Sequence, residues 1–225
     1  MKLLLTSGGI TNKSIADALF SLTGKKPEDT TLVFIPTAAN VEAGDKSWLI
    51  NDLLNLKKLN FKSIEITDIS AVDEKIWKPS LEGADVLFFE GGNTYHLMEC
   101  LNKSGLTKML PELLKNKVYV GLSAGSMVTN KDLMLKSSQS LYGEDLDKNY
   151  EMTGLNYVDF YFLPHLNSKY FVNLREGLIK NAFKNMSEST RGGVNKIYVL
   201  DDNSALKIID DKIEVISEGK WFTIN

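Results

Sequence analysis

Short runs of hydrophobic residues alternate with amphipathic stretches over most of the chain. The runs are rich in β-branched and aromatic residues, and polar residues, Gly or Pro bound each of them. Runs that are hydrophobic on both faces are typical of strands that helices cover on each side. The predicted strands are Lys2–Thr6, Thr31–Ile35, Ser63–Ile66, Asp85–Phe89, Val118–Leu122, Val158–Leu163 and Lys196–Leu200.

The stretches between these runs carry hydrophobic residues at three- and four-residue spacing, which predicts helices. Three sets show this spacing: Ile15, Leu19 and Leu22; Leu49, Leu53 and Leu56; and Phe171, Leu174, Leu178 and Ala182. Polar residues that suit helix N-caps are Asn12, Asp45, Asn93 and Asn167. Alternating strands and helices predict an α/β fold: a three-layer α/β/α sandwich with a mainly parallel sheet, as a single domain over residues 1–225.

Two segments differ from this pattern. The tail predicts three short strands joined by tight turns, which we expect to extend the same sheet in antiparallel fashion: Ser204–Ile209, Lys212–Ser217 and Lys220–Ile224. The polar stretch Thr129–Gly154 shows no clear periodicity. A loop of that length is usually either mobile or functional.

Composition narrows the class of protein. The chain has 225 residues, of which 43% are hydrophobic and 24% charged, so a packed globular core is expected rather than disorder. A net charge of −3 and the absence of a basic run disfavour nucleic acid and anionic membranes as partners. The N-terminus lacks the long hydrophobic core of a signal peptide, and no segment is long enough for a membrane helix, so we expect a cytoplasmic protein.

Cysteine and histidine are scarce, which limits the chemistry that the chain can perform. The single cysteine, Cys100, excludes an intrachain disulfide and a cysteine zinc cluster. With two histidines, His96 and His165, a three-histidine metal site is also impossible. Neither a metal nor an organic cofactor is expected.

The strongest local motif is the G-x-S-x-G of Gly121–Gly125, which follows a predicted strand and precedes a predicted helix. A nucleophile on such a sharp turn has a strained backbone, and its neighbours must be small. The helix N-terminus then offers free N–H groups to a developing oxyanion. Ser123 is therefore the candidate nucleophile; the alternative is a tight turn whose serine merely caps the helix.

A second glycine-rich turn, Gly91-Gly92-Asn93, also closes a hydrophobic strand and opens a helix. Paired glycines let backbone N–H groups point into a cavity, so this turn is able to bind an anion or an oxyanion. In an open parallel sheet, both turns lie at the carboxyl ends of strands, where ligands bind. Gly-Gly-Asn also occurs in ordinary loops, so this turn alone is weak evidence for a ligand site. Two glycine-rich turns at one edge of the sheet are stronger evidence.

A serine nucleophile needs a base and an acid. His165 follows the predicted strand Val158–Leu163 and is favoured as the base, whereas His96 lies within a helix and is interpreted as a packing or surface residue. Asp201 and Asp202 end another strand, and the pattern does not choose between them. The order Ser, His, acid differs from that of the α/β-hydrolases, which disfavours that fold.

The motifs FFEGGNTYHL and VGLSAGSMV, a Pro-His after a strand, and LDDNSAL occur in this order along nearly the whole chain. Together they resemble the aspartyl dipeptidase and cyanophycinase family of serine peptidases. The resemblance implies a fold like that of class I glutamine amidotransferases, with Ser123 as nucleophile and His165 as base. It also implies that the N–H groups of Gly92 and Ala124 form the oxyanion hole. The family's acid falls on Asp202, although Asp201 stands where the family usually has proline.

The same resemblance suggests a substrate. Arg175, in the segment NLREGLIK, matches an arginine that pairs with the aspartyl carboxylate of the substrate. The expected activity is hydrolysis of small peptides, chiefly dipeptides with N-terminal aspartate. The alternatives are a related hydrolase acting on a β-aspartyl polymer or another acyl compound, a glutamine amidotransferase, which is disfavoured because Cys100 is not on the turn, and a non-catalytic anion-binding module. The oligomeric state, monomer or homodimer, stays open.

Overall fold

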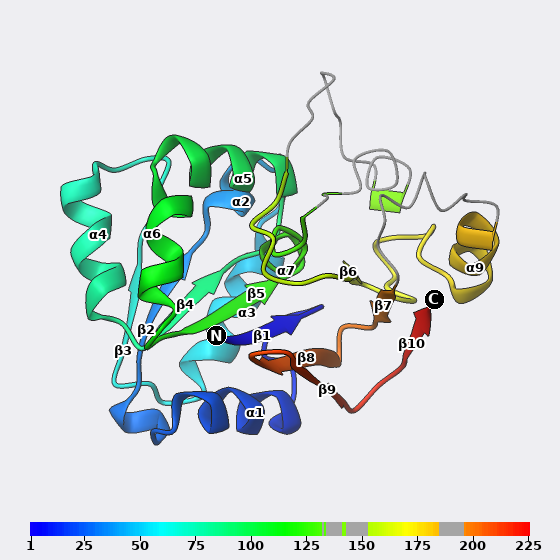
Figure 1. Cartoon of the computed structure of the whole chain (residues 1–225), viewed down its shortest axis with the longest axis horizontal. Helices are drawn as coiled ribbons and strands as arrows, with labels where there is room; N and C mark the ends of the chain where they lie inside the picture. The colour runs from blue at the N-terminus through cyan, green and yellow to red at the C-terminus, as the bar shows by residue number, and fades with distance from the viewer. Residues whose placement is uncertain (132, 134–140, 143–152, 185–195) are drawn as a thin grey trace.

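The central sheet has seven strands in the order β3-β2-β4-β5-β1-β8-β9 (Figure 1). The computed structural model describes residues 1–131, 133, 141–142, 153–184 and 196–225. The first five strands in this order are parallel, and β8 and β9 add to the β1 edge in antiparallel fashion. The strands are β1 (Lys2–Thr6), β2 (Thr31–Ile35), β3 (Ser63–Ile66), β4 (Val86–Phe89), β5 (Val118–Leu122), β8 (Ser204–Ile209) and β9 (Lys212–Ser217).

Helices cover both faces of this sheet (Figure 1), as the alternation of strands and helices predicts. Successive side chains of a strand point to opposite faces, so Leu87 and Phe89 pack into one core cluster and Val86 and Phe88 into the other. The helices are α1 (Lys13–Thr23), α2 (Thr37–Asn40), α3 (Ser47–Lys57), α4 (Glu74–Gly83), α5 (Thr94–Lys103), α6 (Leu106–Leu113), α7 (Ala124–Met127) and α9 (Glu176–Lys184), with a short 3₁₀ helix at Pro27–Asp29.

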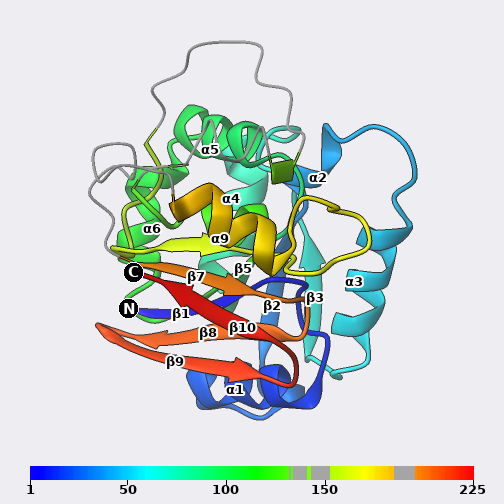
Figure 2. The same cartoon turned by 90° about the vertical axis from the view of Figure 1, so that its right-hand side faces the viewer.

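A second, three-stranded sheet corrects the predicted arrangement of the last strands. It consists of β6 (Tyr161–Leu163), β7 (Ile197–Leu200) and β10 (Trp221–Ile224) in the order β10-β7-β6, and Figure 2 shows β10 running beside β7. The prediction that the whole tail extends one sheet is therefore right for β8 and β9 and wrong for β10. Phe222 and Ile224 pack against a third core cluster beneath α9. Burial of these side chains draws β10 away from the edge at β9.

The capping residues show how local sequence sets the helix boundaries. Asn12 and Asn93 accept the N–H groups of Ile15 and His96, as expected of N-caps. The prediction for Asp45 is wrong by one position: Lys46 is the N-cap of α3, although Asp45 accepts the N–H of Ser47, the first residue of the helix. The prediction for Asn167 is wrong, because this residue has φ +61° and α9 begins only at Glu176.

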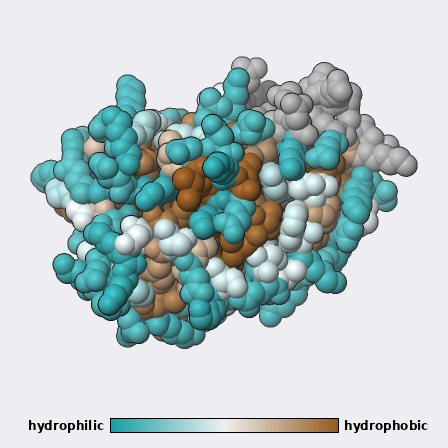
Figure 3. Space-filling model, turned by 60° about the horizontal axis from the view of Figure 1, so that its bottom comes forward, coloured by the Kyte–Doolittle hydropathy of each residue, from teal (hydrophilic) through white to brown (hydrophobic). Residues whose placement is uncertain are grey.

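The surface is mixed in character. Figure 3 brings the bottom of Figure 1 forward and shows hydrophobic residues near the middle of that face, with hydrophilic residues around them. Within the described residues, no helix is both long enough and apolar enough to cross a membrane. Most of the stretch Thr129–Gly154 lies outside the described residues, so the expectation of a mobile or functional loop stays a prediction.

Candidate active site

Ser123 lies on a sharp turn between β5 and α7, with φ +48° and ψ −107°. Such a conformation is unfavourable for a residue with a side chain and persists only where the surroundings enforce it. Here the neighbours are two glycines in close contact. A Cβ on Gly121 would lie 2.5 Å from the carbonyl carbon of Gly125, and a Cβ on Gly125 would overlap the carbonyl oxygen of Phe89. The G-x-S-x-G spacing is therefore a packing requirement of this turn.

His165 lies between Ser123 and Asp202. Its Nε2 is 2.8 Å from Ser123 Oγ, and its Nδ1 is 2.6 Å from Asp202 Oδ1. The imidazole stacks on the ring of Phe171 at 4.8 Å between centroids, and only 13% of the histidine side chain is exposed. The structure thus brings together the serine, the histidine and one of the two candidate aspartates in a single chain of hydrogen bonds.

The structure separates the two adjacent aspartates, which the sequence left open. Asp201 accepts hydrogen bonds from the Ser204 hydroxyl at 2.6 Å and from the backbone N–H of Lys220 at 2.5 Å, so it organises the turn between β7, β8 and β10. Asp202 faces His165. Burial tends to raise the pKa of Asp202, but the hydrogen bond and charge of His165, with the Ser7 hydroxyl, outweigh burial and lower the pKa. Asp202 therefore stays ionised beside the imidazole.

Ser7 is a residue of this site that the sequence analysis did not single out. Its Oγ lies 3.0 Å from Asp202 Oδ1 and accepts the N–H of His165 at 2.7 Å. His165 has φ +67°, an uncommon value for a residue with a side chain. The available signal was position alone: Ser7 follows β1 directly, at the carboxyl edge where the other site residues gather.

The Gly91-Gly92 turn lies against the nucleophile. A Cβ on Gly91 would lie 3.2 Å from the Cβ of Ser123, and a Cβ on Gly92, which has φ +125°, would overlap the carbonyl of Ala38. The N–H of Asn93 donates to that carbonyl at 2.9 Å, which fixes the turn. The N–H of Ala124 belongs to the first turn of α7, where backbone donors lack a partner within the helix. Ala124 directly follows Ser123, and Gly92 directly follows the glycine that lies against it; their role as an oxyanion hole stays a prediction.

Arg175 lies directly before α9 rather than within it. Its Nη1 donates to the carbonyls of Ser168 at 2.9 Å and Phe171 at 3.1 Å. Because the Phe171 ring stacks on His165, the guanidinium is tied to the segment that holds the imidazole. Within the part of the chain that the structure describes, the bonds of this guanidinium use Nη1 alone, which leaves Nε and Nη2 available to an anion.

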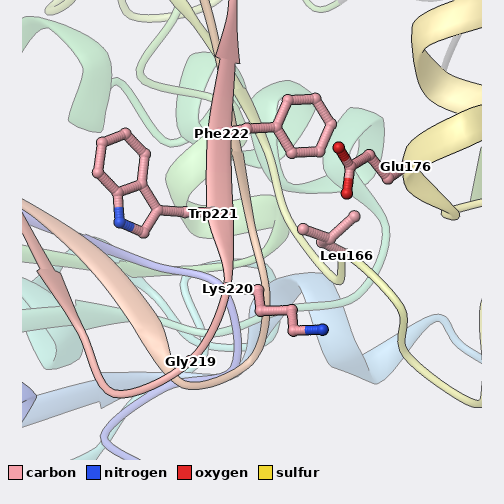
Figure 4. A pocket seen from close by; sticks show the side chains of 6 residues that line it. All are labelled: Leu166, Glu176, Gly219, Lys220, Trp221 and Phe222. Atoms are coloured by element: carbon pink, nitrogen blue, oxygen red, sulfur yellow. The ribbon is translucent and has the colours of Figure 1, made fainter.

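A cavity of about 400 Å³ lies next to this segment, between β10 and the start of α9 (Figure 4). It adjoins the candidate site through Leu166, which follows His165. Figure 4 shows Phe222 and Glu176 turned toward one another across it, with Trp221 on the opposite side of β10. The cavity is lined by Leu166, Glu176, Gly219, Lys220, Trp221 and Phe222.

The second histidine takes no part in this arrangement. His96 lies on α5, and its Nε2 is 3.4 Å from the sulfur of Cys100 on the same helix. This agrees with its interpretation as a packing residue. Among the described residues, no group of three or more His, Cys, Asp or Glu side chains forms a possible metal site.

Comparison with known proteins places the chain in a family. The model of Peptidase family S51 matches residues 3–216. The chain belongs to peptidase family S51. This confirms the family that the sequence motifs resemble, and it makes the chain a member of a family of peptidases.

Relatives of this S51 member carry peptidase names. An uncharacterized peptidase of Listeria innocua is 28% identical over 193 residues, which cover 82% of this chain and 87% of that protein. Peptidase E of Shewanella oneidensis is 28% identical over 138 residues, 60% of this chain and 53% of that protein. A crystal structure provisionally assigned as a peptidase E, from Listeria monocytogenes EGD-e, has a TM-score of 0.75 at 24% identity and covers 97% of this chain and 98% of its own. That likeness confirms the predicted α/β fold.

Proposed function

We propose that this S51 member is a serine peptidase with Ser123 as nucleophile, His165 as general base and Asp202 as the acid that orients it. The observation that carries the proposal is the pair of distances at His165: 2.8 Å from Nε2 to Ser123 Oγ and 2.6 Å from Nδ1 to Asp202 Oδ1. This is the relative geometry that an activated serine needs, with the base in reach of the hydroxyl and a carboxylate fixing its tautomer.

The proposed reaction proceeds through an acyl-enzyme. Ser123 Oγ attacks the scissile carbonyl carbon while His165 Nε2 accepts the hydroxyl proton. The N–H groups of Gly92 and Ala124 bind the oxyanion of the tetrahedral intermediate, and His165 then gives its proton to the leaving amine. Water, deprotonated by His165, attacks the acyl carbonyl and releases the acid and Ser123. Asp202 stays ionised throughout and stabilises the imidazolium.

Small peptides with an N-terminal aspartate are the proposed substrates. Arg175 supports this choice because its Nη1 bonds hold the guanidinium next to the histidine segment while Nε and Nη2 stay available. A guanidinium offers a carboxylate two parallel hydrogen bonds, which favours aspartate over a neutral side chain. The peptidase E names of the Shewanella relatives support hydrolysis of peptides.

A substrate panel tests the proposal. Purified wild-type protein and Ser123→Ala are incubated with Asp-Leu, Leu-Leu, a β-aspartyl-arginine dipeptide and glutamine, and released amino acids are quantified. The proposal predicts cleavage of Asp-Leu by the wild type alone. Cleavage of the β-linked peptide instead would favour the polymer-degrading alternative, and ammonia from glutamine would favour an amidotransferase. Asp-Leu cleavage by Ser123→Ala at the wild-type rate would refute the proposed nucleophile.

A further inference from the structure

Two carboxyl groups that take no part in the proposed triad lie side by side near it. Asp52 is on α3, and Glu90 directly follows β4. Glu90 is fully buried, and apart from Asp52 and the nearby N–H of Gly91, no described group interacts by a hydrogen bond with its carboxylate oxygens. Asp52 is partly accessible and interacts with Glu90 side chain to side chain. Across the described residues, no lysine, arginine or histidine forms an ion pair with either carboxyl group.

This carboxyl pair lies between two turns that border Ser123 and Asp202. A Cβ on Gly8 would lie 2.7 Å from the Cβ of Asp202, and a Cβ on the next residue, Gly9, would lie 3.7 Å from Asp52 Oδ1. On the other side, Glu90 leads directly into Gly91, which contacts Ser123. The pair therefore lies at the carboxyl edge of the sheet. Glu90 is next in sequence to the glycine beside Ser123, and Asp52 lies near Gly9, which follows the glycine beside Asp202.

The electrostatics of the pair disfavour the ionisation of both carboxyl groups at once. Burial raises the pKa of Asp52 to about 7; its hydrogen bond with Glu90 opposes the rise and the charge of Asp202 adds to it. Burial and the charge of Asp52 also raise the pKa of Glu90, which the nearby N–H of Gly91 only partly opposes. Two adjacent carboxyl groups of this kind share a proton because both cannot ionise cheaply. A cation next to the pair would favour the ionised form of both carboxyl groups.

We propose that Asp52, backed by Glu90, binds the α-ammonium group of the peptide substrate. The inference rests on the proposed function, because it places the free amino terminus next to the carbonyl that Ser123 attacks. In a peptide with N-terminal aspartate, the ammonium is attached to the carbon next to the scissile carbonyl. The proposal requires that, with the carbonyl oxygen at Gly92, the ammonium extends toward the residues that precede this turn, and Glu90 directly precedes it. Binding releases the shared proton to solvent, so that an ammonium faces two carboxylates.

The chemistry of the pair favours an ammonium over other cations. Ca²⁺ and Mg²⁺ prefer six or more oxygen ligands. The described residues provide no cluster of three or more His, Cys, Asp or Glu side chains, so a divalent metal is disfavoured here. An ammonium needs only a few acceptors at hydrogen-bond distance, which two carboxylates supply. Such a site would restrict the enzyme to substrates with a free amino terminus. Arg175 would bind the side-chain carboxylate of the substrate's aspartate.

Two substrates that differ only in the ammonium test the proposal. L-aspartic acid α-(p-nitroanilide) and succinic acid mono-p-nitroanilide share the carboxylate and the scissile anilide, but the second lacks the amine. We expect Asp52→Asn to lower kcat/KM for the aspartyl substrate by roughly 10- to 100-fold, the effect of losing a charged hydrogen-bond partner, and to change the succinyl substrate less than about twofold. Glu90→Gln should act in the same direction. The matched control is Asp17→Asn, an exposed carboxylate on α1 that pairs only with Lys13 and should change neither substrate.

A binding measurement separates failure of this site from failure of the proposed function. In the Ser123→Ala background, L-aspartate should raise the melting temperature more than succinate does, and adding Asp52→Asn should abolish that difference. Equal losses of kcat/KM for both anilides, or equal stabilisation by L-aspartate and succinate before and after Asp52→Asn, would overturn the ammonium site. Loss of all hydrolysis with the ligand difference intact would instead refute the proposed peptidase reaction and leave the ammonium site supported.

Discussion

The hydroxyl of Ser7 links the proposed base and the proposed acid: its Oγ lies 3.0 Å from Asp202 Oδ1 and accepts the backbone N–H of His165 at 2.7 Å. Ser7 follows β1, His165 follows β6 and Asp202 follows β7, so three strand ends from two sheets converge on one oxygen atom. The seven-stranded sheet carries Ser123, and the smaller sheet carries the histidine and the acid. Ser7, at the end of a strand of the large sheet, therefore fixes the positions of His165 and Asp202 relative to that sheet, which also carries Ser123.

Replacing Ser7 tests this positioning role. Ser7→Ala removes a hydrogen bond to a charged carboxylate, worth about 1.5–3 kcal/mol, so we expect kcat to fall roughly 10- to 100-fold with little change in KM. Steady-state kinetics on an aspartyl p-nitroanilide measure the changes in kcat and in KM separately. Ser14→Ala is the control, since that hydroxyl bonds Glu218 at the surface. A loss confined to thermal stability, with kcat unchanged, would reduce Ser7 to a structural residue.

The adjacent aspartates should respond in opposite ways. Asp202→Asn removes the charge that orients His165, so we expect kcat to fall about 10³- to 10⁴-fold while the melting temperature changes little. Asp201→Asn replaces one of the two oxygens that accept from the Ser204 hydroxyl and the Lys220 N–H with an NH2 donor, so one of these donors loses its partner. It should therefore lower the melting temperature and leave kcat within a few-fold of wild type. Kinetics and thermal denaturation of both variants decide the matter. The reverse pattern would show that the triad acid has been assigned to the wrong residue.

Arg175 should control the preference for aspartate. Arg175→Lys keeps the positive charge but loses the two-pronged contact, and Arg175→Ala loses both. We expect the ratio of kcat/KM for Asp-Leu to that for a neutral ester to fall in both variants, and to fall further in Arg175→Ala. Because Nη1 also holds the carbonyls of Ser168 and Phe171, some loss on the ester is expected as well. Equal losses on both substrates would leave Arg175 with the loop-holding role alone.

The carboxyl pair predicts an unusual dependence of stability on pH. In the unfolded chain Asp52 ionises near its ordinary pKa of 3.8, whereas the folded protein holds the proton until about pH 7. Between these values the folded state binds more protons, so the free energy of unfolding falls as pH rises. Burial drives this rise in the pKa of Asp52, the charge of Asp202 adds to it, and the hydrogen bond with Glu90 opposes it. The contribution is fully present below pH 4 and is lost by pH 8.

Thermal denaturation of Asp52→Asn measures that contribution. Asparagine cannot ionise, so the variant should melt at or below the wild-type temperature at pH 4 and above it at pH 8. A contribution on the order of 2 kcal/mol corresponds to roughly 4–8 °C for a chain of this size. Asp17→Asn should follow the wild-type curve throughout. Parallel curves for wild type and Asp52→Asn across this range would contradict a proton held in common by Asp52 and Glu90.

Strand periodicity predicts most of the fold because buried strands leave a strong local signal. The bounds of β1, β2, β3 and β5 agree with the prediction, and the G-x-S-x-G motif lies at the predicted turn. Pairing partners leave no such signal. Trp221–Ile224 has the same alternation whether it pairs with β9 or β7, and only burial of Phe222 and Ile224 in the third cluster decides.

The site residues divide in the same way. Ser123 and His165 follow recognisable strands, and their side chains are rare or distinctive enough for a prediction. Asp52 is different. The helical spacing of Leu49, Leu53 and Leu56 assigns Asp52 to a polar face of its helix, and the neighbouring sequence does not show that this face contacts Glu90. Contacts between elements far apart in the sequence create its environment, so the structure is needed to find it.

Covalent labelling tests the central claim most directly. Wild-type protein, His165→Ala and Asp202→Asn are treated with a fluorophosphonate, and the modified residue is located by peptide mass mapping. A hydroxyl that His165 activates should react rapidly at Ser123 in the wild type and at least about 10²-fold more slowly in His165→Ala, the usual scale for loss of a general base. Absence of the adduct from Ser123, or labelling at the same rate without His165, would contradict the proposed nucleophile and its mechanism.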